Sequence, residues 1–219
     1  MGVYRISRHR LLARQARAKS FIGENMGLNE RTRIIGIASG KGGVGKTSIA
    51  ANLAVNLVMR GHKVMLFDAD LGLANAQLAF GCATRFNFGH VLRGEKSLQE
   101  IVVTTPQGVR LVPGASGIQQ LASLGALETA GIVRAFSTLD EEIDYLIVDA
   151  AAGISDSVIT FMQATPLRFI VLRDEPSSIA DAYGMIKVLV RQHGLENIHL
   201  LPNMVDSQAA GLALHRRVN

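Results

Sequence analysis

The segment SGKGGVGKTS, residues 39–48, holds four glycines and two lysines in ten positions. Residues 40–47 match the pattern G-x-x-x-x-G-K-[ST], which is typical of a phosphate-binding loop. The apolar run RIIGIAS at 33–39 precedes it and predicts a buried strand, and helical patterning follows from Lys46 to about Met59. Strand, glycine loop and helix in this order are the context that such a loop requires.

The chemistry of this loop is carried by backbone N–H groups and by the positive end of the following helix, both of which bind phosphate oxygens. We expect Lys46 to reach the β- and γ-phosphates of a nucleotide and the hydroxyl of Thr47 to bind Mg²⁺. A phosphate loop of this kind needs one lysine, so this chemistry leaves Lys41 unexplained. The nucleotide-contacting set predicted from the pattern is Gly40, Gly42, Gly43, Val44, Gly45, Lys46, Thr47 and Ser48.

Strands and helices alternate along the rest of the chain. Further strands are expected at 63–70, 109–114, 144–151, 168–174 and 198–205, and helices at 74–80, 88–92, 98–102, 129–139, 156–163, 177–192 and from 207. Nearly continuous apolar strands that alternate with helices predict a mostly parallel sheet covered on both faces. We therefore expect a three-layer α/β/α P-loop NTPase domain over 33–219, preceded by a basic tail or helix at 1–32.

Three aspartates follow apolar strands in this pattern. Parallel sheets bind ligands at the carboxyl ends of their strands, where all three should lie. Asp149 ends its strand as a Walker-B acid does and is expected to hold Mg²⁺ directly or through water. Asp68 or Asp70 is expected to position or deprotonate the attacking water, and Asp70 is better placed because it lies further into the loop. An ordinary turn-forming aspartate is the alternative for each.

Composition and charge limit the class of protein. With 219 residues, of which 48% are apolar, the chain can bury one sizeable core, and its single cysteine, Cys82, excludes an intramolecular disulfide. No signal-peptide core or membrane-length apolar run is present, so we expect a cytoplasmic protein. Residues 1–33 carry eight Lys or Arg and two acids, a net +6 against +5 for the whole chain. This tail would suit nucleic acid, an anionic membrane or an acidic partner, or would be a solvated leader.

The motif KGGVGKT, residues 41–47, resembles the deviant Walker A motif of the MinD/ParA class of P-loop ATPases. The resemblance implies that Lys41 is the signature lysine of that class. Such a lysine reaches across an ATP-sandwiched homodimer to the nucleotide of the partner subunit and helps to neutralise charge in the transition state. It would act as a cation supplied in trans, like an arginine finger.

Other segments are similar to the flagellar-number regulators called FlhG, FleN or YlxH: FDADLGLAN, VPGASGIQ, DAAAGISDSV and DEPSSIADAYGMIK, over about Arg33 to the end. The resemblance implies a dimerisation switch that binds ATP or ADP with Mg²⁺, hydrolyses ATP slowly and regulates flagellar number, placement or assembly. It assigns Asp70 to the attacking water, Asp149 to the Walker-B acid and Asp68 to Mg²⁺ or its waters. Asn203, at the end of IHLLPN, matches the position that recognises adenine.

The chain departs from that family in three places. Residues 149–153 read DAAAG where family members read DTAAG or D-x-P-A-G. The hydroxyl lost at Ala150 would weaken a contact to the switch or to water, so the resemblance implies ATP binding more firmly than it implies turnover. Family members continue past the helix at 207–216 with a strand, an adenine-covering loop and a membrane-binding helix. We therefore expect a C-terminally incomplete domain that has no membrane anchor in this chain and would be peripheral at the inner membrane only in a full-length form. The segment that activates the FlhF GTPase in flagellar members is retained only at Gln15 and Ala16, so an FlhF-like partner is a weak implication.

Two other functions stay open. One is a positioning ATPase of the ParA or MinD type that acts on DNA or in cell division, although nucleic-acid binding is not favoured. The other is a non-catalytic nucleotide-binding adaptor. An iron protein of the nitrogenase type is excluded because it needs two cysteines per subunit, and the six histidines show no metal-ligand or hydrolytic pattern.

Overall fold

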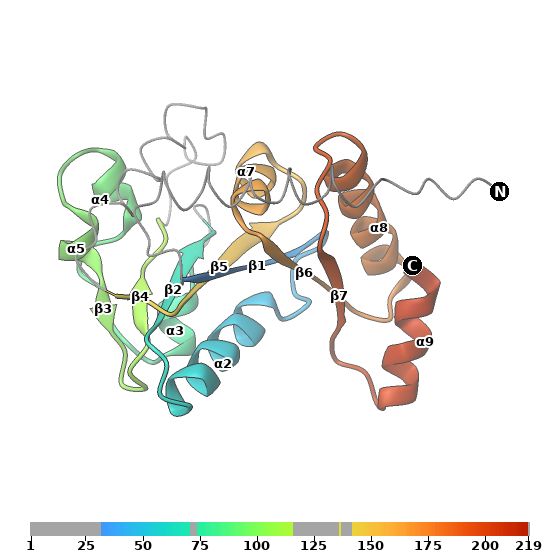
Figure 1. The fold of residues 1–219 in the computed structure, drawn as a ribbon, viewed down its shortest axis with the longest axis horizontal. Coiled ribbons are helices and arrows are strands. Elements are labelled where there is room, and N and C mark those ends of the chain that lie inside the picture. Colours follow the sequence, from blue (N-terminus) through green and yellow to red (C-terminus); the bar gives the residue numbers. More distant parts are fainter. Residues whose placement is uncertain (1–31, 71–73, 116–135, 137–141, 219) are drawn as a thin grey trace.

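A seven-stranded sheet forms the centre of the molecule in a computed structural model that describes residues 32–70, 74–115, 136 and 142–218 (Figure 1). Its order is β3-β4-β2-β5-β1-β6-β7, and the described neighbours run parallel except β3 and β4. The strands are β1 (Arg33–Ser39), β2 (Val64–Ala69), β3 (Val103–Thr104), β4 (Arg110–Val112), β5 (Tyr145–Ala152), β6 (Leu167–Leu172) and β7 (Ile198–Pro202).

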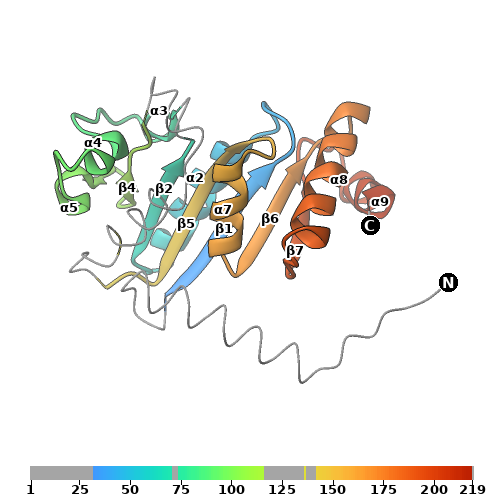
Figure 2. The same ribbon diagram turned by 90° about the horizontal axis from the view of Figure 1, so that it is seen from above.

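Helices cover both faces of this sheet, which confirms the predicted three-layer arrangement. The described helices are α2 (Lys46–Met59), α3 (Ala76–Ala79), α4 (Phe88–Leu92), α5 (Leu98–Ile101), α7 (Asp156–Ala164), α8 (Pro176–Arg191) and α9 (Gln208–Val218). Helices α2 and α3 pack on one face, whereas α7 and α8 pack on the other (Figures 1 and 2). Helix α9 lies beside β7 and α8.

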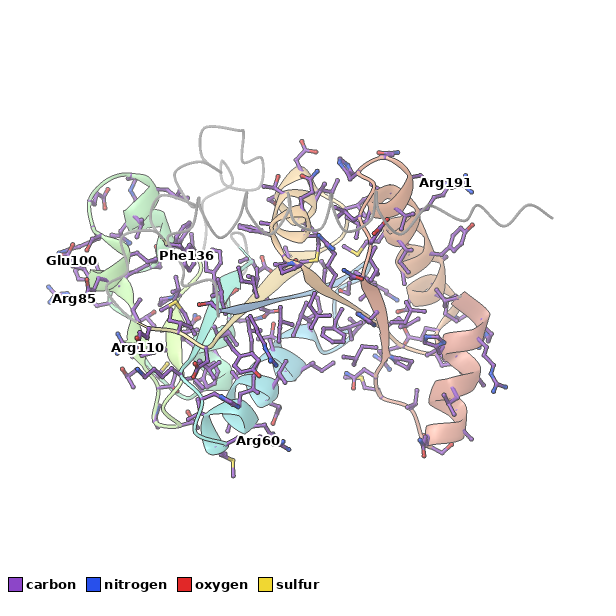
Figure 3. All side chains as sticks on the ribbon, viewed as in Figure 1. Arg60, Arg85, Glu100, Arg110, Phe136 and Arg191 are labelled. Carbon is purple, nitrogen blue, oxygen red and sulfur yellow. The ribbon has the colours of Figure 1, made fainter. Side chains whose placement is uncertain are left out.

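Each face of the sheet has its own apolar core. On the α7 side, the ring of Phe67 from β2 lies 4.8 Å from that of Phe88 and 5.4 Å from that of Phe136, which Figure 3 labels. On the other side, α2 buries Ala50, Ala51 and Ala54 against the sheet. These small side chains bring the helix close to the strands and so fix the loop that begins it.

The strands predicted from apolar runs are all found, with ends that coincide, as in β1, or differ by up to three residues. The expected helix at 74–80 is shorter: α3 begins at Ala76, where the backbone N–H groups of Asn75 and Ala76 donate to the Asp68 carboxylate. Strand β3 was not predicted, since two residues of edge strand give no periodic signal. The expected helix at 129–139 lies outside the described residues apart from Phe136, and so does the expected tail up to residue 31.

Strand β7 is the last strand in the sheet order and pairs with β6 within the part of the chain that the structure describes.

None of the helices in these residues is long and apolar enough to cross a membrane.

Candidate functional site

The loop from Gly40 to Gly45 joins β1 to α2 at the carboxyl edge of the sheet, as the sequence predicted (Figure 1). Gly43 and Gly45 have φ values of 75° and 93°, a left-handed backbone that favours glycine. Gly45 is the N-cap of α2, and no side chain among the described residues caps the helix there. The first N–H groups of α2 therefore face the loop without a side-chain acceptor, which suits an anion.

Gly40 and Gly42 differ in what surrounds them. A Cβ atom on Gly40 would overlap the backbone carbonyl of Asp181, so this glycine lets the loop lie against α8. A Cβ atom on Gly42 would meet no described atom within 4 Å. The loop is thus packed tightly at its start and open at its centre.

Lys46 is the first residue of α2 and lies within electrostatic reach of Asp149 and Asp70. Burial lowers the pKa of Lys46, while the two carboxylates oppose that change. A partly desolvated ammonium group beside the loop would interact strongly with a phosphate, because fewer water molecules screen its charge.

Asp149 lies in β5 between the partner positions Ile37 of β1 and Asp68 of β2, and its side chain is buried. It shares a side-chain hydrogen bond with Thr47. The pKa of Asp149 is raised to about 7, chiefly by burial and also by the carboxylates of Asp68 and Asp70, while Thr47 and Lys46 act to lower it.

The Thr47 and Asp149 pair fits the expected Mg²⁺. Among the described residues, Oδ1 of Asp149 is buried without a hydrogen-bond partner. Mg²⁺ takes oxygen ligands and commonly uses one or two protein groups together with substrate phosphates. A cation bound here would satisfy that oxygen and stabilise the ionised carboxylate. The metal-binding assignment of these two residues remains a prediction.

The Asp68 carboxylate organises the chain that follows β2. Its Oδ2 accepts hydrogen bonds from the backbone N–H groups of Asn75 and Ala76, both at 2.9 Å, and its Oδ1 accepts one from Asp70 at 3.1 Å. Burial raises the pKa of Asp68 to about 6, although these three N–H groups lower it. Asp68 therefore holds the backbone of Asp70 in place, and support of Mg²⁺ or its waters by Asp68 remains a prediction.

Gly114 is a site residue that the sequence did not single out. A Cβ atom there would lie 2.5 Å from the backbone oxygen of Asp68. The chain after β4 therefore packs directly on the residue that shapes the loop after β2. In the sequence, Gly114 is the last residue of the expected strand at 109–114 and belongs to the segment VPGASGIQ, but neither feature indicated that it would pack on Asp68.

Lys41 is bonded to residues at the start of α8, whereas Lys46 lies near Asp149 and Asp70 in what we call the cradle, the phosphate loop together with these two aspartates. Its Nζ donates hydrogen bonds to Oγ of Ser177 at 2.8 Å and to Oε2 of Glu175 at 3.3 Å. The other Glu175 oxygen lies 3.1 Å from Nη2 of Arg173. The Lys41 and Glu175 side chains remain 41% and 38% exposed. Sequence reasoning missed Glu175 and Ser177 as partners, because nothing local connects residue 41 with the start of α8.

The remaining predicted residues also lie around this edge of the sheet. Nδ2 of Asn203, directly after β7, donates to the carbonyl oxygen of Val44 at 2.8 Å. Ser48 is exposed in the first turn of α2. Ala150, the departure in the Walker-B turn, is buried in the core and pairs with Ala69. The structure thus brings together the loop, Asp68, Asp70, Asp149 and Asn203 from four separate segments, while the contacts of adenine and water remain predictions.

Comparison with known proteins adds a family context to this geometry. Residues 35–219 match the model of the CobQ/CobB/MinD/ParA nucleotide binding domain. The chain is 42% identical over 195 residues to the antiactivator FleN of Pseudomonas aeruginosa, covering 89% of this chain and 70% of that protein. It is 40% identical over 205 residues to the flagellum site-determining protein YlxH of Helicobacter pylori, covering 91% and 66%.

A solved structure is similar in fold as well as sequence. The septum site-determining protein MinD of Pyrococcus horikoshii, complexed with Mg-ADP, superposes with a TM-score of 0.66 at 26% identity. The match covers 84% of this chain and 77% of that one. The chain is therefore similar to MinD in the fold of its sheet as well as in the sequence of its phosphate loop.

Proposed function

Because the chain belongs to the CobQ/CobB/MinD/ParA nucleotide-binding domain family, we propose that it is an ATP-dependent dimerisation switch that hydrolyses ATP slowly. Its ligands are ATP or ADP with Mg²⁺. The similarity to FleN and YlxH supports a function in regulating flagellar number or placement.

The observation that carries this proposal is the difference between the two loop lysines. Lys46 lies inside the cradle with Asp149 and Asp70, where it can neutralise phosphate charge of its own nucleotide. Lys41 is turned toward α8 and held by Glu175 and Ser177 at a half-exposed position. A cation at this outer position is placed to meet a second subunit, which supports an action in trans.

The residues of the cradle divide the chemistry among them. Bound Mg²⁺ would neutralise phosphate charge, held by Thr47 and Asp149. Lys46 binds the phosphates, and Asp70, whose backbone N–H is fixed by Asp68, orients the attacking water. ATP stabilises the dimer more than ADP does, because the γ-phosphate of ATP adds contacts that the monomer does not make.

Mixing two inactive variants tests the action in trans. Lys41→Ala should bind nucleotide and lose turnover, and Asp70→Ala should form a stable ATP-bound dimer. In a mixed dimer, the Lys41→Ala subunit keeps its own Asp70 and receives Lys41 from its partner. An equimolar mixture should therefore recover up to about a quarter of the parent ATPase rate, because half of the dimers contain one complete site.

Each variant alone at the same total concentration is the control for this mixture. A mixture that stays as inactive as the separate variants would contradict the trans role of Lys41. Parent-level turnover by Lys41→Ala alone would contradict it as well. Failure of the parent to bind ADP with Mg²⁺ would instead refute nucleotide binding itself.

A further inference from the structure

Asn203 contacts the phosphate loop directly, in addition to occupying the position expected to recognise a base. Its Nδ2 lies 2.8 Å from the carbonyl oxygen of Val44, 159 positions earlier in the chain. A Cβ atom on the next residue, Gly45, would lie 2.5 Å from the same nitrogen. The amide group is therefore packed against the backbone of the loop and bonded to it.

Both ends of this hydrogen bond are fixed to the sheet. The backbone N–H of Asn203 donates to the carbonyl oxygen of Leu172 at 2.9 Å and so extends the pairing of β6 with β7. The side chain of Val44 is buried in the core between α2 and the sheet. Rotation of the peptide between Val44 and Gly45 would break the bond, because neither end can follow.

The orientation of this peptide determines what the loop offers a ligand. In a planar trans peptide, the carbonyl oxygen and the following N–H point in opposite directions. Since the Val44 oxygen faces Asn203, the Gly45 N–H is directed to the other side of the loop. Successive N–H groups in a loop of this kind are the ones that bind phosphate.

We propose that Asn203 is a positioning residue that fixes the Val44–Gly45 peptide in its phosphate-binding orientation and so couples the base pocket to the phosphate site. This inference rests on the proposed nucleotide binding. An asparagine amide has two N–H donors and one acceptor oxygen, and Val44 uses one donor. Among the residues that the structure describes, no other hydrogen bond engages the second donor or the oxygen, so one side chain can serve both ends of the nucleotide.

Inorganic tripolyphosphate with Mg²⁺ tests this coupling, because it has neither base nor ribose. In Asn203→Ala, the affinities for tripolyphosphate and for ADP should both fall by roughly three- to tenfold, the effect of one lost hydrogen bond. Displacement of a fluorescent ADP analogue measures both. A loss confined to ADP would show that Asn203 serves only the base, and unchanged affinity for both would show that it serves neither, so each result overturns the proposal.

Two further variants separate positioning from packing. Asn203→Asp keeps the size of the side chain, but its carboxylate can only accept hydrogen bonds, so tripolyphosphate affinity should fall here too. Met204→Ala is the matched control, since the Met204 side chain also lies near Gly45 but makes no hydrogen bond to the loop among the described contacts. It should leave tripolyphosphate affinity unchanged.

An amide spectrum of the ¹⁵N-labelled chain provides a readout that does not depend on affinity. The Gly45 N–H signal should shift in Asn203→Asp and stay in place in Met204→Ala. An unshifted Gly45 signal in Asn203→Asp would overturn the proposal. If the parent binds ADP with Mg²⁺ while these results fail, only the positioning role is refuted and the proposed function stands.

Discussion

Lys41 and Glu175 form an ion pair across 134 positions of the chain, with Nζ 3.3 Å from Oε2. Ser177 adds a hydrogen bond at 2.8 Å, so the start of α8 holds the second lysine of the phosphate loop. A lysine that acts on a partner subunit must leave or rearrange these contacts. Glu175 and Ser177 of the same subunit therefore compete with a second subunit for Lys41.

Removal of the charge on Glu175 should favour ATP-dependent association. In Glu175→Gln, Lys41 loses its ion pair and becomes more available to a second subunit. A partly exposed pair contributes up to about 1 kcal/mol and the dimer contains two of them, so its dissociation constant should fall by up to about thirtyfold. Sedimentation with a non-hydrolysable ATP analogue measures this, and Glu142→Gln, which breaks the exposed pair with Lys63, is the control. Weaker association in Glu175→Gln would indicate that Glu175 contributes to the dimer instead.

Loss of the Thr47 and Asp149 pair should abolish the contribution of Mg²⁺ to ADP binding. The expected observation is that Mg²⁺ strengthens ADP binding by the parent but not by Thr47→Val or Asp149→Asn. Calorimetric titration with and without Mg²⁺ gives this ratio. Asp206→Asn, a change of an exposed aspartate away from the cradle, should keep it. If both cradle variants retain the full Mg²⁺ effect, the cation is bound elsewhere.

The stability of the nucleotide-free protein should depend on pH through the two buried aspartates. Burial raises the pKa of Asp149 to about 7 and that of Asp68 to about 6, above the ordinary value of 3.8. The folded protein thus binds protons that the unfolded chain has lost, and the stabilisation from these groups declines as pH rises from about 4 through about 7. Between pH 5 and 8, the melting temperature of the parent should fall more steeply than that of Asp149→Asn. Parallel curves for the two proteins would show that Asp149 titrates normally.

Substitution of Gly40 should destabilise the fold, whereas the same change at Gly42 should not. A methyl group on Gly40 overlaps the backbone of Asp181, which cannot move without shifting α8. We expect a loss of roughly 1–3 kcal/mol in the free energy of unfolding for Gly40→Ala, measured by urea denaturation. Gly42→Ala meets no described neighbour and should unfold like the parent. Equal stability of the two variants would mean that the loop is not packed on α8 in solution.

Local features explain why so much of this site could be predicted. The apolar runs of β1, β2 and β5 identify buried strands because each run contains its own signal. The spacing of glycines and Lys46 identifies the phosphate loop for the same reason. The gathering of the acids near the carboxyl ends of β2 and β5 follows as well, since parallel strands bring these ends to one edge, although β5 continues beyond Asp149 to Ala152. The prediction failed for β3, which is too short to carry a pattern.

The amino-acid sequence by itself determined the three-layer fold, the phosphate loop and the set of acids that surrounds it. Only the tertiary structure decided how those groups are engaged. It bonds the Asp68 carboxylate to three backbone N–H groups, turns Lys41 onto Glu175 and ties Asn203 to Val44. The physical reason is distance along the chain. Secondary structure follows from residues a few positions apart, whereas the Lys41 and Asn203 contacts join residues that only the assembled sheet brings within hydrogen-bonding range.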